Sequence, residues 1–359
     1  MGQIQEIHKT FIALVRLGIG HYSDRLSDTI DWKTVRDIAD EQGLTAIVLD
    51  GIQQLPELKR PTQVLLLEWI GEVLQSYEYR YEQYRRTIAE MAGFYNSHGY
   101  KMMVLKGYAC SLDWPKPGHR PCGDIDIWQF GEYKKADNLL AKEKGVSIEE
   151  DRHHHTVFNW GEFAVENHYD FINVHSHKSS KGLEKIFKEL GQDDSHSILI
   201  NGEMVFLPSP NLHALFLLRH AVSHFAAEGI TLRNVLDWAF FMEKHSKEVD
   251  WKWLMPIVDE YHMRDFFNCI NAICVEDLGF SSSIFLSVQF LPDLKNKVLS
   301  DIVNPEFQHE PPAQMLTRLV FKYRRWKANE WKRKLCYDES RLSNLISGVW
   351  AHLLKPKTI

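Results

Sequence analysis

Gly123-Asp124-Ile125-Asp126-Ile127 is the segment from which the architecture of this chain can be worked out. Because successive side chains of a strand point to opposite faces, Asp124 and Asp126 share one face while Ile125 and Ile127 enter the core. Two neighbouring carboxylates repel each other unless a cation lies between them. Such oxygen ligands suit Mg²⁺ or Mn²⁺, which also bind substrate phosphates. The segment therefore predicts phosphoryl-type chemistry at a buried strand.

A later segment offers a third carboxylate. In Glu162-Phe-Ala-Val-Glu166-Asn-His168-Tyr-Asp170, alternation places four polar side chains on one face of an expected strand, namely Glu162, Glu166, His168 and Asp170. A third carboxylate that faces the aspartate pair would complete a site for one or two divalent ions. Two ions about 3.5–4 Å apart can stabilise both the attacking and the leaving oxygen of a displacement at phosphorus.

The pattern of apolar residues changes twice along the chain. Residues 1–97 show apolar residues at helical spacing, residues 98–208 mix short buried strands with brief helices, and residues 209–359 return to helix. A chain of 359 residues is also too long for one ordinary core. We therefore expect an α+β fold in which a small mixed-sheet core, residues 98–208, is flanked by N-terminal and C-terminal helical regions.

The elements expected in the core are strands over residues 100–105, 124–130 and 204–207, further strands between 146 and 174, and helices over 107–112 and 132–144. Three prolines make residues 114–121 an irregular loop. In the N-terminal region, Asp31 is expected to cap a helix, and Gly99 is expected to end a long helix over residues 61–97.

Composition narrows the class of protein. An apolar fraction of 44% and a charged fraction of 25% are typical of a globular protein, and a net charge of -6 argues against wholesale nucleic-acid binding. Five cysteines without a CxxC pair fit unpaired thiols in a reducing compartment. Neither a secretory signal nor an apolar run long enough to cross a bilayer is visible. We expect a cytoplasmic protein.

Four short motifs follow one another in a fixed order. They are Leu105-Lys106-Gly107, Arg120-Pro121-Cys122-Gly123-Asp124-Ile125-Asp126, His155-Thr-Val-Phe158 and Val165-Glu166-Asn167-His168. They resemble the Leu-Lys-Gly turn, the Arg-x-x-Gly-Asp-hydrophobic-Asp element, the His-x-x-Phe strand and the Glu-x-His strand of a bacterial group of uncharacterised nucleotidyltransferases. That group lies within the nucleotidyltransferase superfamily, which has a polymerase-beta-like core. The likeness extends over most of the chain to about residue 245.

The resemblance implies an enzyme that moves a nucleoside monophosphate from a nucleoside triphosphate such as ATP to an unknown acceptor, with release of pyrophosphate. It makes Mg²⁺ or Mn²⁺ the cofactor, and it makes the catalytic metal ligands Asp124, Asp126 and Glu166. The residues that would hold the phosphates are Lys106, Gly107, Arg120 and Gly123. One departure is Tyr108, because many superfamily members have a small residue after the turn glycine. The acceptor is a hydroxyl or amine of a small molecule, a protein or an RNA.

Histidines supply the candidate substrate contacts. Within the run His153-His154-His155, neighbouring side chains alternate faces and cannot all reach one ion, so His155 is expected to touch substrate instead. His168 is a second candidate for orienting the acceptor. The helical segment after the core adds further substrate-binding candidates, namely His220, His224, Arg233 and Asp237. Structural use of these four, including a helix ion pair between Arg233 and Asp237, is the alternative.

Residues 318–334 form a basic cluster interleaved with aromatic side chains. Such a segment either faces an anionic partner, RNA or a lipid surface, or buries its aromatic residues against the protein and leaves its cations in water.

Two other functions stay open for the chain as a whole. One is a metal-dependent phosphoesterase that uses the same carboxylates with the histidines, and the other is a catalytically silent nucleotide-binding or interaction module.

Overall fold

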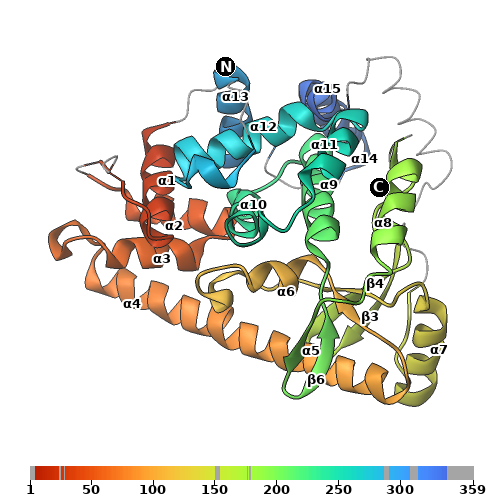
Figure 1. Ribbon diagram of the computed structural model, residues 1–359. Coiled ribbons are helices and arrows are strands. Elements are labelled where there is room, and N and C mark those ends of the chain that lie inside the picture. The colour runs from red at the N-terminus through yellow and green to blue at the C-terminus, as the bar shows by residue number, and fades with distance from the viewer. Residues whose placement is uncertain are drawn as a thin grey trace. The chain divides into compact units, whose positions relative to one another are not determined.

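The computed structural model describes residues 5–23, 26–27, 29–149, 154–175, 177, 179–286, 291–307 and 314–337. The chain forms two compact units (Figure 1). The first contains the described parts of residues 1–73, 218–247 and 251–344, and the second contains residues 74–217 and 248–250 wherever the structure describes them. The division expected from the sequence, at residues 97 and 208, stays a prediction.

The first unit is built from helices throughout its described part. These are α1 (Glu6–Gly18), α2 (Trp32–Glu41), α3 (Thr45–Gln53), α4 (Gln63–Glu72), α10 (Leu232–His245), α11 (Trp251–Glu260), α12 (Arg264–Ala272), α13 (Pro292–Val303), α14 (Met315–Ala328), α15 (Glu330–Tyr337) and the later part of α9 (Pro210–Ala227). Asp31 caps α2 as predicted, because its carboxylate accepts from the backbone N–H of Thr34 at 3.2 Å.

The second unit contains a six-stranded mixed sheet with strand order β3-β4-β2-β1-β6-β5. The strands are β1 (Met103–Val104), β2 (Ile125–Trp128), β3 (His155–Trp160), β4 (Phe163–His168), β5 (Ser197–Ile200) and β6 (Glu203–Phe206). Its helices are α5 (Arg80–Ser97), α6 (Lys106–Ser111), α7 (Tyr133–Lys144), α8 (Ser180–Leu190) and the start of α9. The α+β class predicted from the sequence is confirmed.

Strand register brings the polar residues of the sheet together. β2 and β4 are parallel, with Asp126 opposite Glu166 and Trp128 opposite His168. β3 and β4 are antiparallel, with His155 opposite His168. Because paired residues point to the same face of a sheet, the side chains of these five residues share one face.

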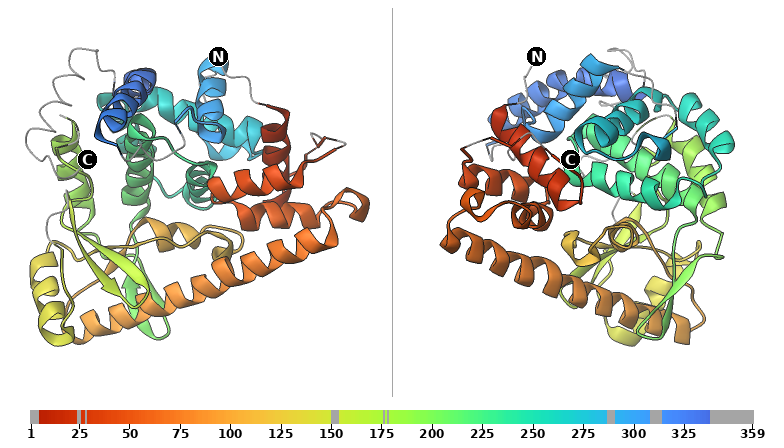
Figure 2. Two further views of the ribbon diagram at one scale, coloured as in Figure 1. Left: turned by 180° about the vertical axis from the view of Figure 1, so that it is seen from behind. Right: turned by 60° about the vertical axis from the view of Figure 1, so that its left-hand side comes forward.

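The opposite face of the sheet is covered by α5 and α7 (Figure 2). Ile125 and Ile127 pack there against Ile88 and Met91 of α5 and Leu140 of α7, and all five side chains are buried. This apolar layer explains the alternation in the segment that carries the aspartates, since each inward isoleucine forces the neighbouring aspartate to the other side.

A buried polar network also lies behind the sheet. The carboxylate of Asp137 in α7 accepts from the Thr156 hydroxyl of β3 at 2.7 Å and from the Asn167 amide of β4 at 2.8 Å. The same amide donates to Gln129 Oε1 at 2.8 Å. These bonds tie α7 to β3 and β4 and so fix the spacing of these two strands.

Aromatic side chains cover one end of the polar face. Trp128 contacts Phe171 with ring centroids 4.5 Å apart, and its indole N–H donates to the carbonyl of Gly191 after α8 at 2.9 Å. Phe171 in turn packs against Phe187 of α8 and Phe216 of α9. Trp128, Phe171, Phe187 and Phe216 therefore form an apolar wall at this end of the polar face.

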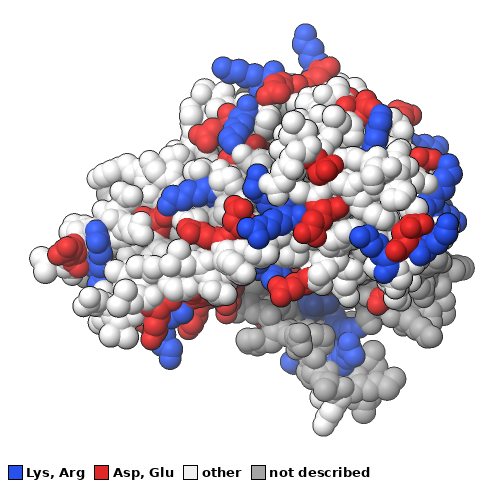
Figure 3. Space-filling view, turned by 90° about the horizontal axis from the view of Figure 1, so that it is seen from below, with Lys and Arg blue, Asp and Glu red and all other residues white. Residues whose placement is uncertain are grey.

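Charge is mixed on the outside. On the face drawn in Figure 3, the described Lys and Arg side chains alternate with Asp and Glu and form no continuous area of one sign. The five cysteines are free thiols, four of them buried. Within the described part of the chain, none of the helices combines the length and the apolar character that a membrane span requires.

Replacement of Asp137 by Ala is expected to lower the free energy of unfolding by about 1–3 kcal/mol, because it leaves the Thr156 hydroxyl and Asn167 amide buried without this acceptor. Urea-induced unfolding measures the loss. The neighbouring exposed residue on the same helix supplies the control, since Asn138→Ala should change stability by less than about 0.5 kcal/mol. Equal stability of the two variants would show that the network does not hold the strands.

Candidate active site

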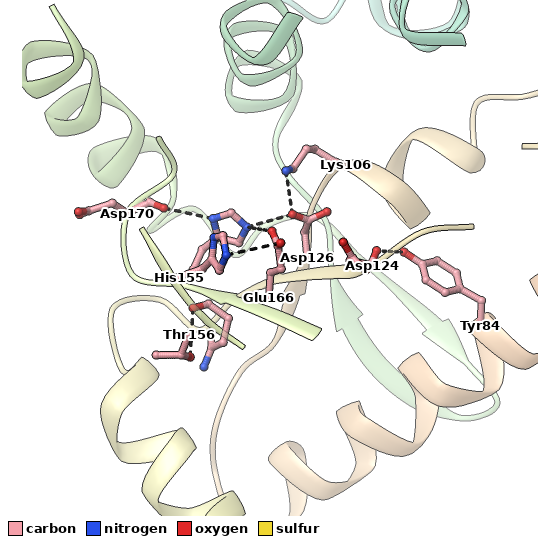
Figure 4. A network of polar contacts seen from close by, with 10 residues as sticks. Tyr84, Lys106, Asp124, Asp126, His155, Thr156, Glu166 and Asp170 are labelled. Carbon is pink, nitrogen blue, oxygen red and sulfur yellow. Dashed lines mark hydrogen bonds and ion pairs between the residues drawn. The ribbon is translucent and has the colours of Figure 1, made fainter. Parts of the chain in front are cut away.

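Asp126 and Lys106 form an ion pair where β1 and β2 meet α6 (Figure 4). The Leu105 N–H donates to the Asp126 carbonyl at 2.9 Å, so the chain leaves β1 directly beside Asp126. Lys106 then begins α6, and its Nζ lies 2.8 Å from Asp126 Oδ1 and 5.6 Å from the centroid of the Phe216 ring. The ammonium group therefore lies between the carboxylate and the apolar wall.

Glu166 and two imidazoles complete this cluster. His168 Nε2 lies 3.0 Å from Asp126 Oδ1 and 3.7 Å from Glu166 Oε2, and His155 Nε2 lies 3.5 Å from Glu166 Oε1. The Glu166 side chain is 24% exposed and that of Asp126 only 10%, whereas His168 is fully buried. The cluster is thus open to solvent mainly at Glu166 and Lys106.

The two carboxylates respond differently to this crowding. Burial by itself would raise the pKa of Asp126, but the Lys106 ammonium and the His168 imidazole outweigh it and hold that pKa well below its ordinary value. Burial and then the negative charge of Asp126 raise the pKa of Glu166. The pair therefore carries the like-charge strain that a divalent cation would relieve.

The residues after β4 fix the orientation of His168. Its Nδ1 lies 3.2 Å from the backbone oxygen of Asp170, and since a carbonyl oxygen can only accept, this nitrogen carries the proton. The next two N–H groups, those of Phe171 and Ile172, donate to the Glu184 carboxylate of α8 at 3.0 and 3.1 Å. Burial raises the pKa of Glu184 to about 8. Glu184 therefore holds the loop that holds the imidazole.

Asp124 lies just before β2 and its side chain is exposed. Its carbonyl oxygen accepts from the Tyr84 hydroxyl of α5 at 2.9 Å. A Cβ on Gly107 would lie 2.6 Å from that hydroxyl oxygen, so glycine at the turn allows α6 to approach α5 and the start of β2. The charge of Asp124 also contributes to the raised pKa of Glu166, after burial and the larger effect of Asp126, which places its carboxylate near the cluster.

Arg120 and Gly123 precede this aspartate. Arg120 is buried, its guanidinium donates to the Pro121 carbonyl at 3.3 Å, and its charge opposes the rise that burial causes in the pKa of Tyr84 and of Cys122. Gly123 is exposed, and a Cβ there would meet no atom within 4 Å. The protein itself gives no steric reason for glycine at 123, so phosphate binding by both residues stays a prediction.

The donor set fits a divalent cation. Asp126, Glu166 and His168 each offer one ligand atom, and these atoms lie within 4.8 Å of one another. Among the described residues, the group that meets this limit does not include Asp124, although the sequence predicted it as a ligand. His154, His155 and His168 form a second group with the same spacing, and His153 lies outside the described residues.

Two parts of the sequence interpretation need correction. β4 ends at His168, so Glu162 lies in the turn after β3 and Asp170 in the loop after β4, and neither joins Glu166 on the strand. Sequence reasoning also missed Tyr84 and Glu184. Both act through backbone groups of the site, and no motif in the sequence marks such a contact.

The remaining substrate-binding candidates lie in the first compact unit. His220 and His224 of α9 have ring centroids 4.2 Å apart, while Arg233 and Asp237 lie on α10. Their contact with substrate stays a prediction.

In the basic segment over residues 318–334, Trp331 packs edge-on against Phe225, and the buried Lys332 pairs with Asp301 at 2.5 Å. Tyr323 is 61% exposed. Only part of the segment is therefore buried, and an anionic partner for the rest stays a prediction.

Comparison with known proteins gives a family. The model of a family described as uncharacterised nucleotidyltransferase matches residues 28–279, which is more than half of the chain. No curated protein matches. A crystal structure of an antigenic nucleotidyltransferase-like protein from Paracoccidioides brasiliensis is similar at 14% identity over 56% of this chain and 95% of that chain. The TM-score of 0.34 is too low to support a conclusion about this chain. A bacterial origin stays a prediction.

Gly107→Ala is expected to destabilise the protein, because the added Cβ would displace the buried Tyr84 hydroxyl. Overpacking of this kind costs about 1–3 kcal/mol, which exceeds the roughly 1 kcal/mol that Ala gains in a helix. Gly123→Ala is the matched control, since its Cβ meets open space. Urea unfolding compares the two variants, and a Gly107→Ala protein as stable as Gly123→Ala would contradict the close approach.

Glu184 should make stability depend on pH. Its pKa is raised from 4.5 to about 8 by burial, so the folded state favours the protonated form. The stability that this group contributes is complete below its unfolded pKa and is lost as the pH rises through about 8. The difference in unfolding free energy between wild type and Glu184→Gln is therefore expected to shrink from about pH 5 to about pH 9. A difference that stays constant would show that Glu184 is ionised in the fold.

Proposed function

The chain belongs to the family of uncharacterised nucleotidyltransferases, and we propose that it transfers a nucleoside monophosphate group from a nucleoside triphosphate to an acceptor hydroxyl or amine, with release of pyrophosphate. The observation that carries the proposal is the Asp126–Glu166 pair. These carboxylates lie opposite each other on neighbouring parallel strands, on a face that keeps part of Glu166 exposed. Burial and then the charge of Asp126 raise the pKa of Glu166, and the proximity of the two carboxylates favours a cation between them.

Asp126 and Glu166 would hold a divalent cation, Mg²⁺ or Mn²⁺, and the exposed Asp124 would bind at the open side. When bound, such an ion neutralises phosphate charge and lowers the pKa of the attacking group. Tyr84 holds the backbone of Asp124 in place and so keeps this carboxylate at the start of β2. The apolar wall of Trp128 and Phe216 excludes water from one side of the cluster.

Lys106 has a distinct part in the proposal. Its ammonium group pairs with Asp126 at 2.8 Å. A cation at the carboxylates would take over the neutralisation of Asp126, and the ammonium would then be available to the β- and γ-phosphate oxygens. Charge-assisted bonds to these oxygens stabilise the departing pyrophosphate. Arg120 supplies further positive charge on the side of Tyr84 and Cys122.

The residues of the site do not specify the acceptor. The mixed charge on the face of Figure 3 gives no preference for a nucleic acid, which leaves a small molecule or a protein beside RNA. We also propose ATP as the donor and the cytoplasm as the location of the protein.

The test incubates the purified protein with each α-labelled triphosphate, Mg²⁺ or Mn²⁺, and a cell extract as source of acceptors. Wild type should label an acceptor, and Asp126→Asn should lower that labelling by at least about 100-fold, because loss of a group that only supports a metal ligand already costs 10–100-fold. Glu132→Gln, at an exposed carboxylate before α7, should retain full labelling. Circular dichroism confirms that the variants fold.

Other outcomes would replace the proposal. Labelling that survives Asp126→Asn would place the reaction elsewhere. Release of phosphate without incorporation of the α-label would indicate the phosphoesterase, for which the contact of His155 with Glu166 offers a means of activating water. Saturable triphosphate binding without either reaction would indicate a silent nucleotide-binding module.

A further inference from the structure

We propose that the His168 imidazole is itself a metal ligand, so that the cation site is Asp126, Glu166 and His168 Nε2 and prefers a divalent transition-metal ion over Mg²⁺. The inference rests on the proposed function and identifies the cation of the same site. It differs from an all-carboxylate site, and it gives His168 a role other than contact with the acceptor.

The first argument is the spacing of the ligand atoms. His168 Nε2 lies 3.0 Å from Asp126 Oδ1 and 3.7 Å from Glu166 Oε2. A cation bound at roughly 2.1 Å keeps neighbouring ligand atoms roughly 3 Å apart in octahedral geometry. Small side-chain rotations are therefore enough to place one ion in contact with all three groups. The Asp124 carboxylate does not belong to this described group.

The second argument is the orientation of His168. Its Nδ1 donates to the Asp170 carbonyl at 3.2 Å, so Nε2 is the ring nitrogen that faces the two carboxylates. A proton between Nε2 and Asp126 Oδ1 satisfies the 3.0 Å contact, and a bound cation would take the place of that proton. A backbone carbonyl behind an imidazole is also the usual support for a histidine that binds metal through its other nitrogen.

The third argument is burial. His168 is 1% exposed, which leaves almost no surface for an acceptor, while its Nε2 already faces the carboxylates. Its ring lies beside those of His154 and His155, each with a centroid 5.3 Å away, and the loop that orients it is anchored by Glu184. The imidazole is thus held in one orientation before any ligand arrives.

The chemical consequence is selectivity. Carboxylate and water ligands suit Mg²⁺, whereas an imidazole raises the affinity for first-row transition ions. Mn²⁺ is the convenient probe because it is paramagnetic. Pulsed electron paramagnetic resonance of Mn²⁺ bound to the wild-type protein should show coupling to one directly bound nitrogen. Uniformly ¹⁵N-histidine-labelled protein should change that coupling and so assign it to an imidazole.

Variants identify which imidazole is bound. His168→Gln should abolish the nitrogen coupling and lower the ratio of Mn²⁺ to Mg²⁺ affinity, measured by calorimetry, by at least about tenfold. His155→Gln is the matched control, because His155 lies on the neighbouring strand with its Nε2 3.5 Å from Glu166 Oε1, and it should keep the coupling. Asp126→Asn should weaken Mn²⁺ binding at the same site.

Two results separate the inference from the function on which it rests. Mn²⁺ binding that depends on Asp126 but shows no nitrogen coupling would overturn the imidazole ligand and leave the proposed transferase intact. Loss of the coupling in His155→Gln but not in His168→Gln would overturn it as well. Nucleotide transfer absent in a protein that shows the His168-dependent coupling would instead contradict the proposed function.

Discussion

Asp126 is a carboxylate kept ionised inside the protein, and the rest of the site is arranged around that constraint. Burial disfavours its charge, so positive or proton-donating groups must surround it. Lys106 supplies one from the turn after β1, and His168 supplies another from β4. The two partners come from opposite sides of β2 in the strand order, because β1 and β4 are its neighbours in the sheet. The strand order therefore brings three segments of the chain together at Asp126.

Packing within the second unit holds Asp126 and its neighbouring strands rigidly in place. Behind the sheet, Ile125 and Ile127 pack on α5 and α7, while Asp137 ties α7 to β3 and β4. In front, α8 fixes the loop after β4 through Glu184. Rigid support matters because a cation or a phosphate is bound by several groups at once, and each group that must reorder reduces the affinity. Lys106 and Glu166, which are more exposed, are left free to respond to a ligand.

The alternation of aspartate and isoleucine predicted the face of β2 correctly, because side-chain direction in a strand follows from geometry alone. The family resemblance also implied the partnership of Asp126 with Glu166, and the register shows that they lie opposite each other. What the sequence could not supply was the set of contacts made through backbone groups. The Tyr84 hydroxyl on the Asp124 carbonyl and the Glu184 carboxylate on the loop after β4 depend on packing between segments far apart in the chain.

One missed element did have a signal. Asn201-Gly202 separates β5 from β6, and both residues have positive φ, 52° and 89°. Asn-Gly between two apolar runs is the strongest short-range indication of a hairpin, yet only the strand after it was expected. The expected strand over Glu162 to Asp170 was too long, because Glu162 lies in the turn after β3 and Asp170 in the loop after β4.

The most direct measurement is a crystal structure of the protein with Mn²⁺ and a non-hydrolysable nucleoside triphosphate, with the metal located by its anomalous scattering. An anomalous peak between the side chains of Asp126 and Glu166, with the triphosphate extending past Lys106, is the predicted result. A triphosphate bound elsewhere, or a Lys106–Asp126 ion pair that persists with no metal beside it, would contradict the account.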